Sequence, residues 1–243
     1  MIQFDKVTKR FGDLTVLSEV SLTVGKGEFA AIVGPSGCGK STLLRTLAGL
    51  ERPDGGRVTV DAKPVTGPGP DRMLMFQEHA LYPWRTVAAN VGLGLELGGM
   101  SKKERQERVF DVLGRVGLKG FETYYPHQLS GGMRQRAAIA RALVMDPEVL
   151  LLDEPYGALD AMTRLSMQNE LLRLWQGTGK TVLLITHDID EALYLADRVF
   201  VMGARPGRVV QEVQLDQPRP RSRNHAQFGR LRSTLLEALE IAV

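Results

Sequence analysis

The segment Gly34–Thr42 combines glycines, a lysine and hydroxyl side chains in the order Gly-Pro-Ser-Gly-Cys-Gly-Lys-Ser-Thr. It follows an apolar run at 29–33 and leads into residues 42–48, which can wind as a helix, and this is the context of a phosphate-binding loop. The glycines let the backbone turn tightly around an anion, so N–H groups of the turn and of the helix end point at phosphate oxygens. Lys40 supplies a positive charge for the β- and γ-phosphates, and the Ser41 hydroxyl can ligate Mg²⁺.

The chain is therefore predicted to bind a nucleoside triphosphate, rather than to carry a glycine-rich turn that matches by chance. The residues predicted to surround the phosphates are Gly34, Pro35, Ser36, Gly37, Cys38, Gly39, Lys40, Ser41 and Thr42.

Two adjacent carboxylates, Asp153 and Glu154, follow the apolar run 149–152. The carboxyl end of a buried strand is where α/β sheets place their ligands. Asp153 is suited to holding hydrated Mg²⁺, and Glu154 to orienting or deprotonating an attacking water, because phosphoryl transfer needs positioning and charge neutralisation. A chance acidic strand end is the alternative for the pair alone, but the Gly34–Thr42 loop upstream disfavours it.

A second predicted anion site lies in the segment Leu129–Arg136, which reads Leu-Ser-Gly-Gly-Met-Arg-Gln-Arg. Ser130 can cap the helix that follows, and Gly131 and Gly132 expose N–H groups at its positive end. An ordinary serine-capped helix start would have the same pattern. One triphosphate does not need two such sites on one subunit, so we expect two subunits to share nucleotides, each site being completed by the partner's helix end.

Strands and helices must position these groups, and the apolar pattern predicts them. The runs 29–33, 73–76, 149–152 and 181–185 are short and wholly or mostly apolar. Such strands are covered on both faces, which indicates a parallel sheet between helices. The remainder of 1–33 is predicted to form short strands with turns at 11–13 and 24–27, and 57–60 a further strand after a turn at 52–56.

Residues 78 to about 145 are predicted to be mostly helical. Ser101 and Glu104 fit a capping box, and the residues after them show one apolar stripe at helical spacing. A final amphipathic helix is predicted near the end of the sequence. The stripe is Val109, Val112, Leu113 and Val116, and the final helix is marked by Phe228, Leu231, Leu235 and Leu239.

Composition fits a soluble globular protein, since 43% of the 243 residues are hydrophobic and 24% are charged. No apolar run approaches the ~18 residues that a membrane span needs, and no secretory leader is seen, so we expect the protein in the cytoplasm unless a partner carries it to a membrane. The lone cysteine, Cys38, excludes an internal disulfide and suits a reducing compartment. Its thiol either has a lowered pKa or, as we favour, fills a small-residue position.

The formal net charge of +3 is too small to indicate nucleic-acid binding by itself. The positive excess gathers late in the chain and faces few acids. We interpret these arginines as a solvated basic segment, with an anionic membrane surface or partner as the alternative. They are Arg205, Arg208, Arg219, Arg221, Arg223, Arg230 and Arg232.

Together these motifs resemble those of the ATP-binding subunits of ABC transporters, and the resemblance covers essentially the whole chain. Leu129–Gly132 resembles the family's signature, with Met133 where glutamine is commonest, a departure that leaves the backbone donors intact. Gln77 falls where the family has its Q-loop glutamine, near Mg²⁺ and the γ-phosphate. Gly157–Asp160 is similar to the D-loop that couples the two sites.

Two further matches also have structural alternatives. His187 matches the family's switch histidine, which contacts the γ-phosphate, whereas alone it would be read as a capping or core residue. Phe11 lies where the family stacks an aromatic ring on adenine, although a single aromatic residue usually packs in a core.

The resemblance implies an α/β phosphate-loop NTPase fold with a central, mainly parallel sheet and an N-terminal antiparallel β portion. It implies one domain over 1–243, in which 1–77 and 146–243 form the nucleotide-binding core and 78–145 an inserted helical subdomain carrying the signature. Two copies in a homodimer, or two similar subunits in a pseudo-dimer, would close head to tail around ATP and Mg²⁺. Catalytic roles would fall to Lys40, Gln77, Glu154 and His187, metal binding to Ser41, Gln77 and Asp153, and further nucleotide contacts to Phe11, Ser130, Gly131, Gly132, Met133 and Asp160.

The segment Leu81–Trp84 is rich in aromatic residues, which indicates either core packing or, as the family favours, the surface that receives a coupling helix of the membrane subunit. Together with 131–136, 204–208 and 218–221, it most resembles bacterial nitrate-, sulfonate- or taurine-type importers. The implied partners are a second copy, transmembrane permease subunits and, indirectly, a solute-binding protein, with no nucleic acid. The implied location is peripheral, on the cytoplasmic face of the inner membrane, with a subunit that is soluble when isolated.

Two other classes remain as alternatives. A non-transport ABC ATPase acting on nucleic acid or the ribosome usually has a long coiled-coil insertion or two cassettes, and neither is seen in this sequence. A phosphate-loop kinase or small GTPase would leave the 129–136 segment and His187 unexplained. The sequence does not name the transported solute.

Overall fold

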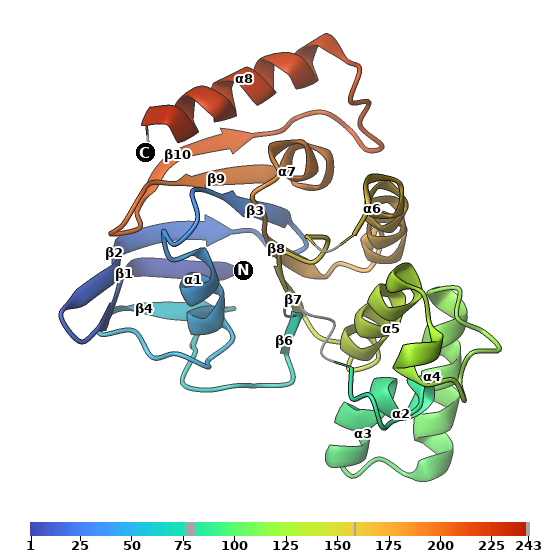
Figure 1. The fold of residues 1–243 in the computed structure, drawn as a ribbon. Coiled ribbons are helices and arrows are strands. Elements are labelled where there is room, and N and C mark those ends of the chain that lie inside the picture. Colours follow the sequence, from blue (N-terminus) through green and yellow to red (C-terminus); the bar gives the residue numbers. More distant parts are fainter. Residues whose placement is uncertain (76–80, 158, 242–243) are drawn as a thin grey trace.

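The computed structural model describes residues 1–75, 81–157 and 159–241, which form two sheets and their flanking helices (Figure 1). The first sheet is antiparallel, and its strand order is β2-β1-β4-β5. This confirms the predicted antiparallel β portion, although the first hairpin has long strands where short ones were expected. The strands are β1 (Ile2–Phe11), β2 (Leu14–Val24), β4 (Gly55–Val60) and β5 (Lys63–Pro64).

The second sheet has the order β10-β9-β3-β8-β7-β6, and all its neighbouring pairs are parallel except β10 with β9. Every residue of β3, β7 and β8 is buried, as expected for all-apolar strands covered on both faces. The central parallel sheet is thus confirmed, while β9 and β10 were not predicted. The strands are β3 (Phe29–Val33), β6 (Arg72–Met75), β7 (Val149–Asp153), β8 (Thr181–Ile185), β9 (Arg198–Met202) and β10 (Val209–Gln214).

The parallel sheet separates two hydrophobic cores. Along β7, Val149 and Leu151 belong to one core and Leu150 and Leu152 to the other, because successive side chains of a strand point to opposite faces. The first core also takes apolar side chains of β1, β2 and α1 (Lys40–Leu47). The second is shared by helices on the other face. They include α5 (Gly131–Leu143), α6 (Ala161–Trp175), α7 (Ile189–Leu195) and α8 (Ala226–Ile241).

The helices α2 (Val87–Val91), α3 (Leu93–Leu97), α4 (Lys102–Arg115) and α5 gather on one side of the molecule, away from the antiparallel sheet (Figure 1). A single 3₁₀ turn, Pro126–Gln128, precedes α5. Ser101 caps α4 as predicted: its Oγ accepts the Glu104 N–H at 3.3 Å and donates to the Glu104 carboxylate at 2.8 Å. The predicted apolar stripe of α4 is buried.

Arg219, Arg221 and Arg223 correct the prediction of a solvated basic segment, because none of them is fully exposed. Residues 215–223, here called the C-terminal strap, lie against the end of α7. Arg221 is buried and its guanidinium donates to the carbonyls of Leu193 and Ala196, while Arg219 donates to Leu195 O at 2.7 Å. The carboxyl end of a helix carries unpaired carbonyls and partial negative charge, so it attracts cations as acidic side chains do. The other four arginines of the predicted set are exposed as expected: Arg205, Arg208, Arg230 and Arg232.

Among the residues that the structure describes, no helix has the length and hydropathy needed to cross a membrane.

Candidate active site

The predicted site residues follow neighbouring strands of the parallel sheet. The strand order β3-β8-β7 places the Gly34–Thr42 loop, His187 and Asp153–Glu154 at the ends of three adjacent strands. Parallel strands end at the same edge, so one edge carries all of these segments. Gln77 itself, and Ala158 in the D-loop-like segment, lie outside the described residues.

The phosphate loop has a backbone that only glycine permits at several positions. Gly37 and Gly39 have φ of 76° and 106°, in the left-handed region. A Cβ at Gly34 would lie 2.7 Å from Met202 O, so the loop passes too close to β9 for any side chain. Helix α1 begins at Lys40, within the Gly34–Thr42 segment and directly after its last glycine. Its first N–H groups therefore face the concave side of the loop.

Lys40 is buried and its ammonium donates to two carbonyls of the loop, Gly34 O at 2.8 Å and Pro35 O at 2.9 Å. These charge-assisted bonds hold the cation inside the loop that phosphates must enter. Because an ammonium is a compact charge on a flexible stem, it can exchange carbonyl partners for phosphate oxygens without a backbone change.

Ser41 and Asp153 meet across the sheet edge, with Ser41 Oγ donating to Asp153 Oδ1 at 3.0 Å. Burial raises the pKa of the Asp153 carboxyl, and the Ser41 hydrogen bond opposes this effect. A hydroxyl and a buried carboxylate are oxygen ligands that suit Mg²⁺, and a cation beside them would favour the ionised carboxylate.

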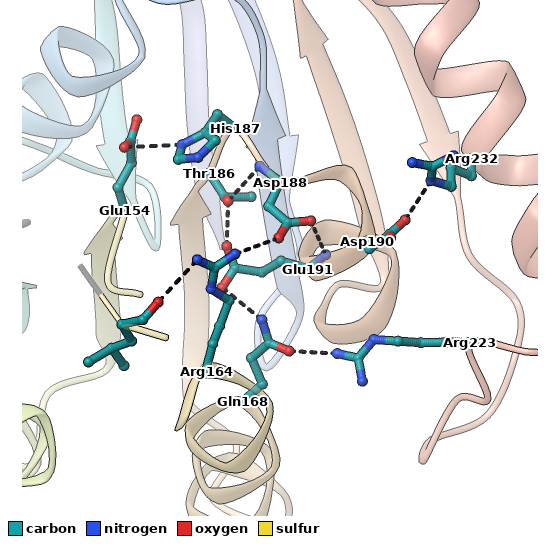
Figure 2. Close-up of polar contacts among 11 residues, drawn as sticks. Glu154, Arg164, Gln168, Thr186, His187, Asp188, Asp190, Glu191, Arg223 and Arg232 are labelled. Carbon is teal, nitrogen blue, oxygen red and sulfur yellow. Dashed lines mark hydrogen bonds and ion pairs between the residues drawn. The ribbon is translucent and has the colours of Figure 1, made fainter. Parts of the chain in front are cut away.

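Glu154 and His187 form the second contact of the site: Glu154 Oε2 lies 3.2 Å from His187 Nδ1 (Figure 2). Glu154 has a φ of 45°, an unusual left-handed conformation for a residue that is not glycine. Its N–H donates to Ile185 O at 2.9 Å, which ties the end of β7 to the end of β8. The strained backbone and the hydrogen bond aim the Glu154 carboxylate at the imidazole.

Cys38 is buried within the loop. Burial raises the pKa of its thiol and outweighs the nearby charge of Lys40. The structure therefore supports the interpretation of Cys38 as a small residue filling a tight position, and the alternative of a lowered pKa is wrong.

The second predicted anion site lies at the start of α5. Ser130 Oγ accepts the Met133 N–H at 3.3 Å, which confirms the predicted cap. Ser130 and Gly131–Met133 line a groove of about 620 Å³ together with Asp160 and the first turns of α6. Asp160 caps α6 through the Thr163 N–H, and this hydrogen bond lowers the pKa of its carboxyl.

The two predicted anion sites, at the starts of α1 and α5, do not meet. Helices α1 and α5 are well separated in Figure 1, and among the described residues no hydrogen bond or ion pair joins Ser130–Met133 to Gly34–Thr42. Phe11, predicted to stack on adenine, ends β1 with 48% of its surface exposed, and the Lys9 ammonium lies 5.1 Å from its ring centroid.

Two residues that contact the site segments, Arg205 and Arg164, were not predicted to do so. Arg205 donates to Gly37 O at 2.8 and 3.1 Å, so it holds the phosphate loop from outside. Arg164 donates to Leu159 O at 3.2 Å and to Asp188 Oδ2 at 3.3 Å, linking the D-loop-like segment to the turn after β8. The turn-forming Arg-Pro-Gly sequence at 205–207 was a visible signal for Arg205, whereas no motif marks Arg164.

Comparison with known proteins agrees with this geometry. The family model described as "ABC transporter" matches residues 17–157. The taurine import ATP-binding protein TauB of Yersinia pestis is 52% identical over 200 residues, covering 82% of this chain and 78% of that protein. The aliphatic sulfonates import ATP-binding protein SsuB of Bacillus licheniformis is 46% identical over 226 residues, covering 93% and 88%.

A solved structure has the same fold. It is a dimeric ATP-binding cassette in a post-hydrolysis state, bound to ADP and Pi, and it is 35% identical with a TM-score of 0.78 over 90% of this chain and 100% of that one. The family model, the relatives and the solved structure all indicate the same family. The chain therefore belongs to the ABC transporter family, as an ATP-binding subunit that hydrolyses ATP.

Proposed function

We propose that this subunit powers a bacterial importer for a small solute of the nitrate, sulfonate or taurine class, and that two copies close around ATP. The observation that carries the proposal is the separation of the two anion-binding helix starts, α1 and α5, within one chain. Each needs a partner across the nucleotide, and a second copy arranged head to tail provides both. The dimeric cassette and the taurine and sulfonate relatives support this arrangement and this solute class.

In this proposal the Gly34–Thr42 loop, with Lys40, holds the phosphates of ATP. Ser41 and Asp153, with Gln77, hold Mg²⁺, which neutralises phosphate charge when it is bound. Glu154 orients or deprotonates the attacking water, and His187 contacts the γ-phosphate. Their 3.2 Å contact supports a joint role, because a histidine beside the base can fix the carboxylate's orientation.

The remaining nucleotide contacts come from two sources. Phe11 stacks on adenine, for which its exposed ring is available. The partner copy supplies the second anion site and the D-loop residue, and the groove that these residues line supports an interface there. The partner's residues are the counterparts of Ser130, Gly131, Gly132, Met133 and Asp160.

The chain divides, in our proposal, into a nucleotide-binding core (1–77 and 146–243) and a helical subdomain (78–145) that receives the permease. Trp84 is 71% exposed and Tyr82 is 40% exposed, with ring centroids 5.4 Å apart. The Asn90 side chain holds the Tyr82 backbone: Asn90 Oδ1 accepts the Tyr82 N–H at 2.7 Å, and Asn90 Nδ2 donates to Tyr82 O at 3.1 Å. An apolar surface on a fixed backbone suits a permease helix.

The shared site is tested by Ser130→Arg. A large cation at this helix start blocks the partner's nucleotide but leaves the chain's own phosphate loop untouched. We expect wild-type ATP binding by the monomer and loss of hydrolysis. The matched control is Ser101→Arg, which removes an equivalent helix cap from α4 outside the site. If Ser130→Arg loses ATP binding itself, the shared-site proposal fails.

The importer role is tested by purifying the subunit from detergent-solubilised membranes with its associated polypeptides. We expect a hydrophobic permease among these polypeptides. We also expect the rate of ATP hydrolysis by the reconstituted complex to rise when taurine, an alkanesulfonate or nitrate is added together with the binding protein. Copurification with nucleic acid or ribosomes in place of a permease would favour the non-transport alternative.

A further inference from the structure

A chain of buried polar side chains runs from the C-terminal strap to the turn that carries His187 (Figure 2). Arg223 donates to Gln168 Oε1 at 2.6 Å, and Gln168 Nε2 donates to Glu191 Oε1 at 3.3 Å. The other oxygen of Glu191 accepts from the Thr186 hydroxyl. The Thr186 hydroxyl in turn accepts the Asp188 N–H at 3.0 Å, so both neighbours of His187 are held.

The interior of this chain is closed to solvent. Gln168 is 2% exposed, Thr186 is 2% exposed and Glu191 is 4% exposed. A buried polar group that loses its protein partner costs about 1–3 kcal/mol, because water cannot reach it as a replacement. Each of these side chains therefore depends on the next for its hydrogen bond.

Arg223 determines which way the Gln168 amide faces. A guanidinium only donates, so the amide oxygen must face Arg223, and this orientation turns the amide nitrogen toward Glu191 Oε1 as donor. A flipped amide would set donor against donor and acceptor against acceptor. Arg223 is itself held by stacking on the Tyr194 ring, 3.9 Å from its centroid.

The turn is also anchored to α7. Asp188 caps this helix by accepting the Glu191 N–H at 3.1 Å, and Glu191 reaches back to Thr186. A change at Gln168 is thus passed through Glu191 to residues on both sides of His187.

We propose that Arg223 and Gln168 are positioning residues for ATP hydrolysis, holding the turn 186–188 so that His187 faces Glu154. The inference rests on the role proposed above for His187. It gives the C-terminal strap a part in turnover although the strap touches none of the predicted nucleotide contacts.

The first test compares Arg223→Met with Arg230→Met by steady-state ATP hydrolysis. Both replace an arginine of the C-terminal region, but Arg230 is exposed and its guanidinium makes no hydrogen bond or ion pair among the described residues. We expect kcat to fall about three- to tenfold in Arg223→Met with KM for ATP unchanged, since one charged hydrogen bond acts on the chemical step alone. Arg230→Met keeps wild-type kcat, and Arg223→Lys recovers most of it.

The second test observes His187 directly in the free protein. The ring resonances of His187 are assigned by their loss in His187→Gln, and they are compared in Arg223→Met, Arg230→Met and Gln168→Met. We expect shifts in the first and third variants and none in the second. Gln168→Met serves as an independent break of the chain on α6, and circular dichroism checks that each variant is folded.

Unmoved His187 resonances in both Arg223→Met and Gln168→Met overturn the inference, whatever the kinetics. Shifted His187 resonances in Arg223→Met together with an unchanged kcat also overturn the inference, because the contact between Arg223 and Gln168 then has no part in hydrolysis. Failure of the proposed function is recognised separately: His187→Gln would then hydrolyse ATP at the wild-type rate.

Discussion

At the residue scale, the Arg205 side chain is a contact to the phosphate loop that lies outside the nine-residue motif. Its guanidinium donates twice to Gly37 O. The next residue but one, Gly207, passes so close to the loop that a Cβ would lie 2.1 Å from Cys38 O. The loop after β9 therefore supports the phosphate loop at Gly37 and Cys38.

We predict that Arg205→Ala raises KM for ATP about fivefold and leaves kcat unchanged. Loss of these hydrogen bonds from an exposed guanidinium costs about 1 kcal/mol in binding, which is close to a fivefold change. Steady-state kinetics measures both constants. The control is Arg208→Ala, which removes an exposed arginine bonded to Ser18 and not to the loop. Equal KM values for the two variants would contradict the prediction.

Glu191 gives a second prediction at this scale. Burial raises its pKa from 4.5 to about 7, and Asp188 adds to this effect while Arg164 opposes it. The folded state then binds more protons than the unfolded state between about pH 4.5 and 7, so this group's contribution to stability falls as pH rises through that window.

We therefore predict that Glu191→Gln gains stability relative to wild type as pH rises from 5 to 8. A shift of this size corresponds to about 3 kcal/mol at most, because one pKa unit is worth about 1.4 kcal/mol. Urea unfolding at each pH measures the difference in free energy of unfolding between the two proteins. A difference that is constant from pH 5 to 8 would show that Glu191 does not titrate in this range.

At the element scale, the C-terminal end of α7 is stabilised by arginines instead of a glycine cap. The Arg221 guanidinium donates to carbonyls of α7 and of the strap itself, and burial lowers its pKa to about 10, so it remains charged at neutral pH. It therefore joins two segments whose carbonyls would otherwise be buried without partners.

We predict that Arg221→Met lowers the free energy of unfolding by about 2–4 kcal/mol, because several buried carbonyls lose their donor at once. Urea denaturation measures the change, and the exposed Arg230→Met provides the baseline. A loss below about 0.5 kcal/mol, typical of surface substitutions, would mean that water replaces the guanidinium.

The sequence predicts those elements whose pattern is local. The runs that became β3, β7 and β8 are wholly or mostly apolar, and the Ser101 and Ser130 caps depend on residues three positions away, so short segments suffice. The motifs Gly34–Thr42 and Asp153–Glu154 are equally local.

What sequence could not supply are partners distant along the chain. The sequence suggests that Arg219 and Arg221 are unpaired charges, because they have few acidic neighbours along the chain, yet they bond to backbone carbonyls of α7 and pair with Asp197. Backbone acceptors leave no trace in composition. In the same way, no motif marks the contact from Arg164 to Leu159 and Asp188, since it forms only when α6 packs beside the turn after β8.

At the scale of the whole molecule, the fold gathers the predicted phosphate and metal contacts at one sheet edge and places the other predicted anion site at the start of α5, which is the separation that our proposal explains. The groove at the start of α5 and α6 has Met162 on its border, with 75% of this large apolar side chain exposed. An exposed apolar side chain at the rim of this groove suits the interface that we propose there.

We predict that Glu154→Gln binds ATP, hydrolyses it at less than about 1% of the wild-type rate and accumulates as a dimer. The amide keeps the side chain's shape but cannot accept a proton from water. Light scattering with and without ATP measures the mass. Lys40→Ala is the control and should stay monomeric, because it removes the cation of the phosphate loop. Normal turnover by Glu154→Gln would show that another group acts as the base.

The attachment of α7 to the C-terminal strap has a consequence for protein synthesis. The ribosome completes the His187 turn and α7 well before it reaches Arg219, Arg221 and Arg223. Until those arginines emerge, the carbonyls at the end of α7 have no donors from the strap. A polypeptide that ended before Arg219 would thus contain every nucleotide motif yet lack these contacts from the strap to α7 and, through Gln168, to the His187 turn.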